Sequence, residues 1–285
     1  MRDESPRTIL ACIDGSVYLE SVCQHAQWAA HQYDTAVRLL HVQASQYESV
    51  VDLSGTLEID TTATLLEQLA QLDEARGKFE REKGQLVLEY ARRFFADTTT
   101  PVTTLHRWGA LVDTVAELES TSQMIVIGKR GEQAQHAVRH LGSNLERVVR
   151  AVHVPVLVVA PAFVPIRRIV IAFDGGLSAR KALDFVIIHP HLHGCDVHIV
   201  LVNADEAQRQ SAIVALQRLN ELSVIAQMHD MNGRPDEVIA SFVQAHDAQL
   251  LLMGAYSHSP IRNLFIGSTT TAILTHCPAS ILLFR

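Results

Sequence analysis

The sequence predicts an α/β fold of two tandem units, each an open, twisted, five-stranded parallel sheet of order 3-2-1-4-5 with helices on both faces. Short β-branched runs alternate with amphipathic stretches along all 285 residues, which is the pattern of βαβ units. A strand that ends in an acid, residues 9–14, also returns 160 residues later as residues 169–174. The chain therefore contains an internal repeat that extends over most of its length.

In the first half, short apolar runs and amphipathic segments predict the elements in turn. Strands are expected at residues 8–13, 36–42, 102–105, 124–127 and 156–159, and helices at residues 20–33, 62–96, 111–119 and 142–152. The longest helix keeps apolar residues at roughly helical spacing. They are Leu65, Leu69, Leu72, Phe79, Leu86, Tyr90 and Phe94. We expect this stripe to be a packed face.

The second half repeats the order with one shortened connection. Strands are expected at residues 168–173, 197–202, 224–228, 250–253 and 280–284, and helices at residues 179–187, 206–221, 236–246 and 267–276. Asp14 and Asp174 are 160 residues apart, whereas Gly128 and Gly254 are 126 apart. Since Val42 and Val202 keep the offset of 160, the surplus of 34 residues in the first half lies after its second strand.

The segment from Pro161 to Pro165 predicts the domain boundary, because two prolines four residues apart continue neither a helix nor a central strand. We expect a first domain at residues 1–163, with the long second crossover, and a shorter second domain at residues 164–285. A linker this short and poor in glycine predicts that the domains pack side by side, as an intramolecular pseudo-dimer.

Composition limits the classes of function. With 48% hydrophobic and 19% charged residues, the chain resembles a soluble globular protein. A net charge of -7 argues against nucleic acid as the main partner. The polar N-terminal residues and the lack of an 18-residue apolar run predict no membrane span and a cytoplasmic location.

Cysteines and histidines give little sign of a metal site. Cys12, Cys23, Cys195 and Cys277 show no CxxC spacing, which predicts buried free thiols. Residues 189–193 read His-Pro-His-Leu-His, and alternate spacing could place imidazoles on one side. Because no carboxylate or cysteine matches this spacing, we interpret the segment as a solvated loop, with metal binding as the weaker alternative.

The residues that indicate chemistry follow the first and fourth strands. In the order 3-2-1-4-5 the chain reverses between these strands, and ligands of Rossmann-like folds bind in the crevice at that point. Asp14 follows the first strand and Gly128 the fourth. Glycines 128 and 131 allow close approach of the backbone, and residues 142–144 open a helix whose free amides and dipole favour an anion.

Further candidates complete the two loops. Lys129 and Arg130 add positive charge and Ser143 a hydroxyl, before Asn144 in the same helix opening. The second copy offers Gly254, Ser257, His258, Gly267, Ser268 and Thr269 in the same places.

Both halves resemble the universal stress protein family in its tandem two-domain form. The family's pattern is a glycine, two residues, a glycine, nine residues, then glycine and serine or threonine. The resemblance implies an adenine nucleotide, ATP or ADP or AMP, with or without magnesium. Its base would lie near the aspartate and the end of the second strand, and its phosphates on the glycine loop. Carried over by position, the pattern falls on Asp14, Val42, Gly128, Gly131, Gly142, Ser143, Asp174, Val202, Gly254, Gly267 and Ser268.

Each half departs from the pattern in its own way. In the first, residues 132–141 make ten rather than nine between the glycines. In the second, the spacing is kept but Ser257 stands where the second glycine belongs. The sequence leaves open which half binds nucleotide, or whether both do.

Catalysis has no recognisable motif, since the chain lacks a Walker loop and a nucleophile elbow. Slow ATP hydrolysis is the most that we expect. The leading hypothesis is a cytosolic nucleotide-binding stress protein, and the alternative is a nucleotide-free module for dimerisation or for binding a protein partner. An ATP-dependent ligase or pyrophosphatase is disfavoured, because the S-G-G-x-D-S loop after the first strand is missing. Monomer and homodimer both stay open.

Overall fold

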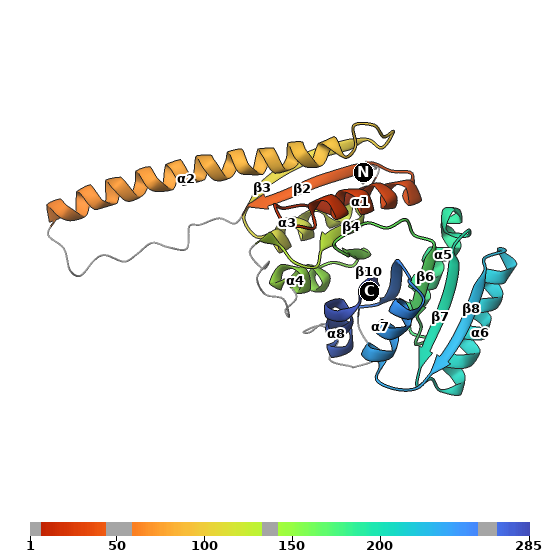
Figure 1. The fold of residues 1–285 in the computed structure, drawn as a ribbon. Coiled ribbons are helices and arrows are strands. Elements are labelled where there is room, and N and C mark those ends of the chain that lie inside the picture. Colours follow the sequence, from red (N-terminus) through yellow and green to blue (C-terminus); the bar gives the residue numbers. More distant parts are fainter. Residues whose placement is uncertain (1–6, 44–58, 133–141, 256–266) are drawn as a thin grey trace.

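The computed structural model describes residues 7–43, 59–132, 142–255 and 267–285 (Figure 1). Within them, ten strands form one sheet of order β3-β2-β1-β4-β5-β10-β9-β6-β7-β8. The strands of the first half are β1 (Thr8–Cys12), β2 (Val37–Gln43), β3 (Val102–Trp108), β4 (Ser122–Gly128) and β5 (Val156–Val159). Those of the second half are β6 (Arg168–Ala172), β7 (Asp196–Val202), β8 (Ala226–Met231), β9 (Leu250–Gly254) and β10 (Ser280–Phe284).

Helices cover both faces of this sheet. One hydrophobic core lies under α1 (Leu19–Tyr33), α2 (Ile59–Arg93), α5 (Leu177–Ile188) and α6 (Glu206–Glu221). The other lies under α3 (Leu111–Leu118), α4 (Ser143–Ala151), α7 (Pro235–Ala245) and α8 (Ser268–His276). Two short 3-10 helices, η1 (Glu119–Thr121) and η3 (Pro190–Leu192), complete the elements described. The predicted α/β class, with helices on both faces of the sheet, is confirmed.

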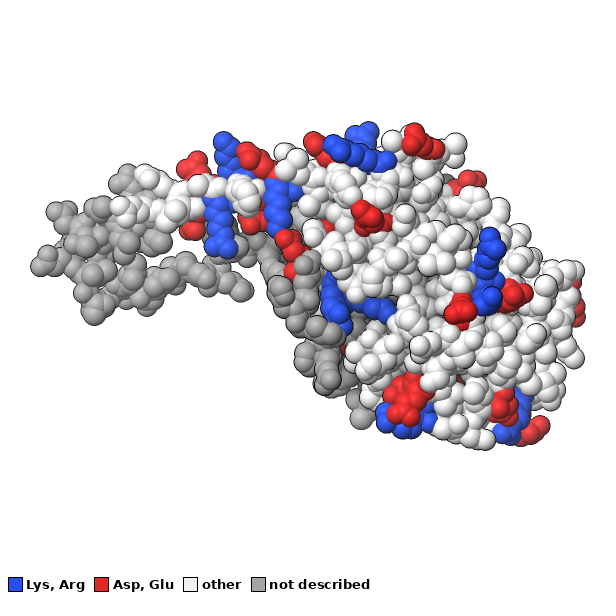
Figure 2. Space-filling model, viewed as in Figure 1, with Lys and Arg blue, Asp and Glu red and all other residues white. Residues whose placement is uncertain are grey.

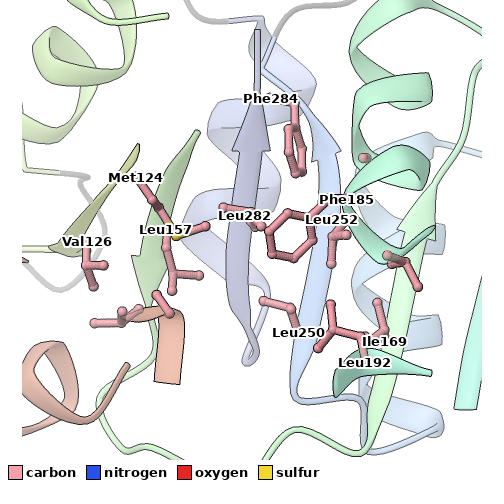
Figure 3. Close-up of a cluster of buried hydrophobic side chains, with 14 of the residues drawn as sticks. Met124, Val126, Leu157, Ile169, Phe185, Leu192, Leu250, Leu252, Leu282 and Phe284 are labelled. Carbon is pink, nitrogen blue, oxygen red and sulfur yellow. The ribbon is translucent and has the colours of Figure 1, made fainter. Parts of the chain in front are cut away.

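The two halves meet along their fifth strands. Each half keeps the predicted order 3-2-1-4-5, but β5 pairs antiparallel with β10, so the two expected sheets join edge to edge. Leu157 lies opposite Leu282, and both strands are entirely buried (Figure 3). An apolar strand left at a sheet edge would expose unpaired amides to water. Pairing of β5 with β10 removes that edge, and the burial of each leucine side chain stabilises the fold by roughly 1.5–3 kcal/mol.

A buried polar network crosses the same seam. The Ser21 hydroxyl donates to the carbonyl of Ala160 (2.6 Å), and the amide of Ala160 donates to the Ser280 hydroxyl (3.0 Å). Nδ1 of His25 lies 2.8 Å from the carbonyl of Ser21, and Nε2 lies 2.8 Å from the Ser280 hydroxyl. Since a carbonyl only accepts, Nδ1 carries the proton and Nε2 accepts from Ser280. This arrangement suits a neutral imidazole.

The histidine-rich segment of residues 189–193 is not the solvated loop that we expected. His189 is buried, and its Nδ1 lies 2.6 Å from the carbonyl of Phe185. Its ring contacts Tyr33 of α1, and His191 contacts His31 of the same helix. This segment forms part of the contact between the halves. Among the described residues, no three His, Cys, Asp or Glu side chains are placed to hold a metal ion.

The stripe of α2 that we expected to be packed is exposed in its middle part, whereas Phe94 at its end packs against the core. The side chains of Leu65 and Leu69 lie outside what the structure describes. Leu72, Phe79 and Leu86 are 65%, 63% and 65% exposed, whereas Gly84 and Leu88 face the sheet. Figure 1 shows the reason, because the N-terminal part of α2 extends beyond β2 and β3 and has no strand beneath it. The expectation is wrong because helical spacing reveals a shared face and not what covers that face.

All four cysteines are buried and free, as the missing CxxC spacing predicted. None of the helices in the described ranges combines the length and apolar character needed to cross a bilayer.

Two glycines of α2 make a matched pair for a stability test. A Cβ at Gly84 would lie 2.6 Å from Cε1 of His106, whereas a Cβ at Gly77 would meet nothing within 4 Å. We expect Gly84→Ala to lower the free energy of unfolding by about 1–3 kcal/mol through overpacking. Gly77→Ala should leave it unchanged or raise it by up to about 1 kcal/mol. Urea unfolding of both variants checks this, and equal effects would contradict the packing described.

His25 should make stability depend on pH. Burial lowers its pKa from 6.5 to about 4. The folded protein thus resists protonation, so the stabilisation is complete above pH 6.5 and is lost as the pH falls toward 4. Between pH 7 and pH 5 the loss should be about 2 kcal/mol.

Urea unfolding at both pH values measures this loss in the wild type and in His25→Asn, whose unfolding free energy should fall less over the same interval. The exposed His276, changed to Gln, is the matched control. A variant His25→Asn with the full wild-type pH dependence would contradict the assignment.

Candidate functional site

Asp14 and the glycine loop meet at the carboxyl edge of the sheet. β1 and β4 are hydrogen-bonded neighbours, with Cys12 opposite Ile127, so the loops that follow them leave the sheet side by side. This is the point where the chain order reverses, because β2 and β3 lie on one side of the pair and β5 on the other. The reversal of strand order that the sequence predicted at this edge is thus present in the fold.

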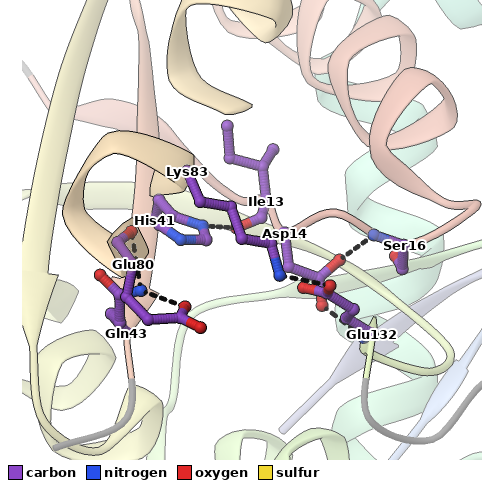
Figure 4. A network of polar contacts seen from close by, with 8 residues as sticks. All are labelled: Ile13, Asp14, Ser16, His41, Gln43, Glu80, Lys83 and Glu132. Carbon is purple, nitrogen blue, oxygen red and sulfur yellow. Dashed lines mark hydrogen bonds and ion pairs between the residues drawn. The ribbon is translucent and has the colours of Figure 1, made fainter. Parts of the chain in front are cut away.

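The carboxylate of Asp14 binds both loops. Its Oδ1 accepts from the amide of Ser16 (3.0 Å), which turns the chain toward α1. Its Oδ2 accepts from the amide of Glu132 (2.9 Å) in the loop after β4 (Figure 4). Hydrogen bonds to an ionised acceptor are stronger than those between neutral groups, so Asp14 fixes the start of the glycine loop.

Two glycines permit this close approach. A Cβ at Gly131 would lie 2.8 Å from Oδ2 of Asp14, and a Cβ at Gly128 would lie 2.8 Å from Cβ of Tyr18. Gly142 is the N-cap residue of α4, and its amide donates to the carbonyl of Lys129 (3.2 Å). Asp14, Gly128, Gly131 and Gly142 are therefore brought together, with the N-terminus of α4 directed at the same loop.

Sequence reasoning did not find Lys83. This residue of α2 places its ammonium 2.5 Å from Oε1 of Glu132 (Figure 4). Its hydrogen bond to Glu132 raises its pKa, and the charge of Asp14 acts in the same direction. The 34-residue surplus after the second strand was the signal for such a residue, since α2, with 35 residues, is much longer than α6, which has 16 residues at the corresponding place in the second half.

The end of β2 forms one wall beside Asp14. Nδ1 of His41 lies 3.0 Å from the carbonyl of Ile13, and Gln43 donates to the carboxylate of Glu80 (2.7 Å). Val42, between them, is partly buried and packs against the core on the other face. The wall therefore holds β2, α2 and the Asp14 turn in fixed positions.

Lys129 lies away from this crevice. It is buried, and its Nζ donates to the carbonyl of Cys277 (2.5 Å), which follows α8 in the other half. Burial lowers its pKa. An ammonium at a helix C-terminus satisfies a free carbonyl and the dipole, so Lys129 joins the halves instead of extending the loop's charge. Arg130 is half-buried beside Gly142, and its charge acts on Tyr18.

The remaining first-half candidates lie at the helix opening. Ser143 and Asn144 are the first two residues of α4, and Asn144 is exposed. The side chain of Ser143 lies outside what the structure describes.

The second half repeats the aspartate turn and covers it differently. Oδ1 of Asp174 accepts from the amide of Gly176 (2.8 Å), and Gly175 adopts φ +74°. Gln208, in the first turn of α6, donates to the carbonyl of Asp174 (3.0 Å). A glutamine thus lies over this turn where the first half has Lys83 and Glu132 beside its aspartate.

The other second-half candidates are in part described. Gly254 ends β9 and Gly267 precedes α8, whose first residues include Ser268 and Thr269. Val202 is partly buried at the end of β7. Ser257 and His258 lie outside the described residues.

Known proteins were compared with the whole chain. The profile of the universal stress protein family matches residues 6–160 and 203–285. Universal stress protein Slr1230 of Synechocystis is 32% identical over 286 residues, which cover 98% of this chain and 100% of that protein.

Two solved structures share the fold over nearly the full length. A universal stress protein from Archaeoglobus fulgidus superposes with a TM-score of 0.65 at 17% identity, covering 98% of this chain and 96% of that one. The functionally unknown protein PA1789 from Pseudomonas aeruginosa gives a TM-score of 0.64 at 18% identity, covering 99% and 93%. The paired arrangement of halves is thus shared with other proteins.

The ion pair between Lys83 and Glu132 should contribute little to folding. Both side chains are well exposed, at 37% and 41%, and exposed pairs are typically worth less than about 1 kcal/mol. We therefore expect Lys83→Met to change the free energy of unfolding by less than about 1 kcal/mol. Chemical denaturation measures it, with Lys78→Met on the same helix as the control. A larger loss would make Lys83 a structural residue.

Proposed function

The chain belongs to the universal stress protein family, and on that premise we propose that the crevice between β1 and β4 binds an adenine nucleotide. Occupancy of this site would link nucleotide level to the protein's role in stress. The single observation that carries the proposal is the contact between Asp14 and the glycine loop, where a Cβ at Gly131 would lie 2.8 Å from the carboxylate. A packing role alone does not require the loop backbone to lie against a carboxylate.

The chemistry of the crevice fits the parts of a nucleotide. Asp14 and the end of β2 offer acceptors and apolar surface for the base and ribose. The loop amides and the N-terminus of α4 favour phosphate oxygens, because unpaired N–H groups and the helix dipole point the same way. ATP, ADP and AMP share the base and ribose and differ in the length of the phosphate chain on the loop.

Positive charge for the phosphates would come from Lys83 and Arg130 instead of Lys129. Lys83 already holds an anionic partner, the carboxylate of Glu132, at 2.5 Å. A phosphate group offers Lys83 the same kind of bond, so nucleotide entry would replace the Glu132 carboxylate as the partner of Lys83. Magnesium would enter bound to the phosphates, since the described residues form no metal site of their own.

We assign the main site to the first half. The first half combines its aspartate with Gly131, Glu132 and Lys83, whereas Gln208 lies over the turn of the second aspartate. A neutral amide there supplies no charge for a phosphate. We place this function in the cytoplasm, where four free thiols stay reduced. No motif supports turnover beyond slow ATP hydrolysis.

The test is direct binding of ATP, ADP and AMP with magnesium by isothermal titration calorimetry. Gly131→Val should weaken binding at least about ten-fold, equivalent to about 1.4 kcal/mol, because its side chain would displace the loop from Asp14. Gly194→Ala is the control, since a Cβ there meets nothing within 4 Å.

Failure of the wild-type protein to bind any of the three nucleotides, or to carry one through purification, would refute the proposal. If Gly131→Val binds nucleotide as tightly as the wild type, the site would be assigned to the second half instead. Saturation at a hundred times Kd should add about 2.7 kcal/mol of stability, so thermal unfolding gives an independent measure.

A further inference from the structure

Helix α2 carries an apolar stripe that no described part of the chain covers. Leu72, Phe79 and Leu86 follow one another at intervals of seven residues and are 65%, 63% and 65% exposed. Seven residues make nearly two helical turns, so the three side chains share one side of the helix, in the heptad spacing of coiled coils. The sequence places another leucine, Leu65, one heptad earlier.

The part of the helix that carries Leu72 lacks tertiary support within the described chain. Figure 1 shows α2 starting far from the sheet and reaching it only near its C-terminal end. The side chains of residues 70–76 are all exposed, whereas Gly84, Leu88 and Ala91 are buried. Most helices in proteins are stabilised by the packing of one face, and isolated helical segments are marginal in water. A helix that extends into solvent with an apolar stripe therefore indicates a partner for that stripe.

The charged residues in and beside the stripe would match the same residues on a second copy of the chain. Arg76 lies within the stripe, four residues after Leu72, and exposed acids border it at Asp73, Glu82 and Glu89. Figure 2 shows both signs of charge side by side on the projecting helix, with uncharged residues between them. In a two-helix coiled coil, a cation in the seam reaches the acids that flank the seam of the partner. The surface that best complements this stripe is therefore the same stripe on a second copy of the chain.

We propose that α2 pairs antiparallel with α2 of a second copy of this chain, so that two chains form a homodimer through a two-helix coiled coil. A two-fold axis makes such an interface isologous, which suits a surface that complements itself. The rungs from Leu72 to Leu86 span about 21 Å of helix, or two heptads. The pairing would bury the stripe that is now exposed.

Charge also selects the antiparallel direction. A parallel pair in register would place Arg76 against Arg76, and like charges in close contact repel. In the antiparallel register, Arg76 lies against Phe79 of the second copy, where a guanidinium is attracted to the ring face. The same register places Leu72 opposite Lys83 and carries the two globular bodies to opposite ends of the coiled coil.

Molar mass in solution tests the pairing and does not depend on nucleotide binding. Over a range of concentrations, light scattering after size exclusion should give the mass of two chains for the wild type. Leu72→Glu combined with Phe79→Glu should give the mass of one chain, with a dimer dissociation constant raised at least about 100-fold, since each tenfold corresponds to about 1.4 kcal/mol. Leu177→Glu is the control, because Leu177 is 77% exposed on α5, far from the stripe along the chain.

Circular dichroism and urea unfolding of the double variant check that the globular part remains folded, which exposed positions should allow. A monomeric wild type, or a double variant that still dimerises, would overturn the proposal. So would a loss of the dimer in Leu177→Glu alone.

Disulfide trapping tests the direction. Chains with Leu72→Cys mixed with chains with Lys83→Cys should form a mixed disulfide under mild oxidation, because the antiparallel register places these positions opposite each other. The native cysteines are buried and should not compete. Self-linked Leu72→Cys chains, without the mixed species, would indicate parallel pairing and overturn the antiparallel arrangement.

Discussion

The antiparallel pairing of β5 with β10 is the interaction on which the rest of the molecule depends. Without it, each half would end in a buried, largely apolar strand with one edge of unpaired amides exposed to water. With it, ten strands share one sheet and the two cores are continuous across the seam. His25 to Ser280 and Lys129 to Cys277 then satisfy buried polar groups that neither half could satisfy by itself.

Once the seam is fixed, the two halves differ mainly through α2. The repeated aspartate turn is nearly the same in both, but the long crossover of the first half places Lys83 beside Glu132 and Asp14. The short crossover of the second half places Gln208 over its turn. The insertion therefore alters the site at its C-terminal end and exposes an apolar stripe at its N-terminal end. A duplicated fold has in this way acquired two different surfaces.

Much of the candidate site could be predicted from the sequence because it depends on local chemistry. Two features specify the turns wherever the sheet places them: a strand that ends in aspartate, and glycines at a set spacing. Asp14, Gly128 and Gly131 were therefore named correctly as neighbours. Lys83 could not be found, since it approaches Asp14 only through the path of α2. For Lys129 the sequence showed the position in the loop but not the direction of the side chain, which points to the other half.

The sequence by itself determined the α/β class, the repeat, the order of strands within each half and the family, because these follow from hydrophobic periodicity and short motifs. Only the tertiary structure decided how the halves join, where Lys129 points and which face of α2 is left uncovered. Those features depend on contacts between residues far apart in the chain. Periodicity records that a residue is apolar or charged, but what it contacts is settled only when separate elements pack together.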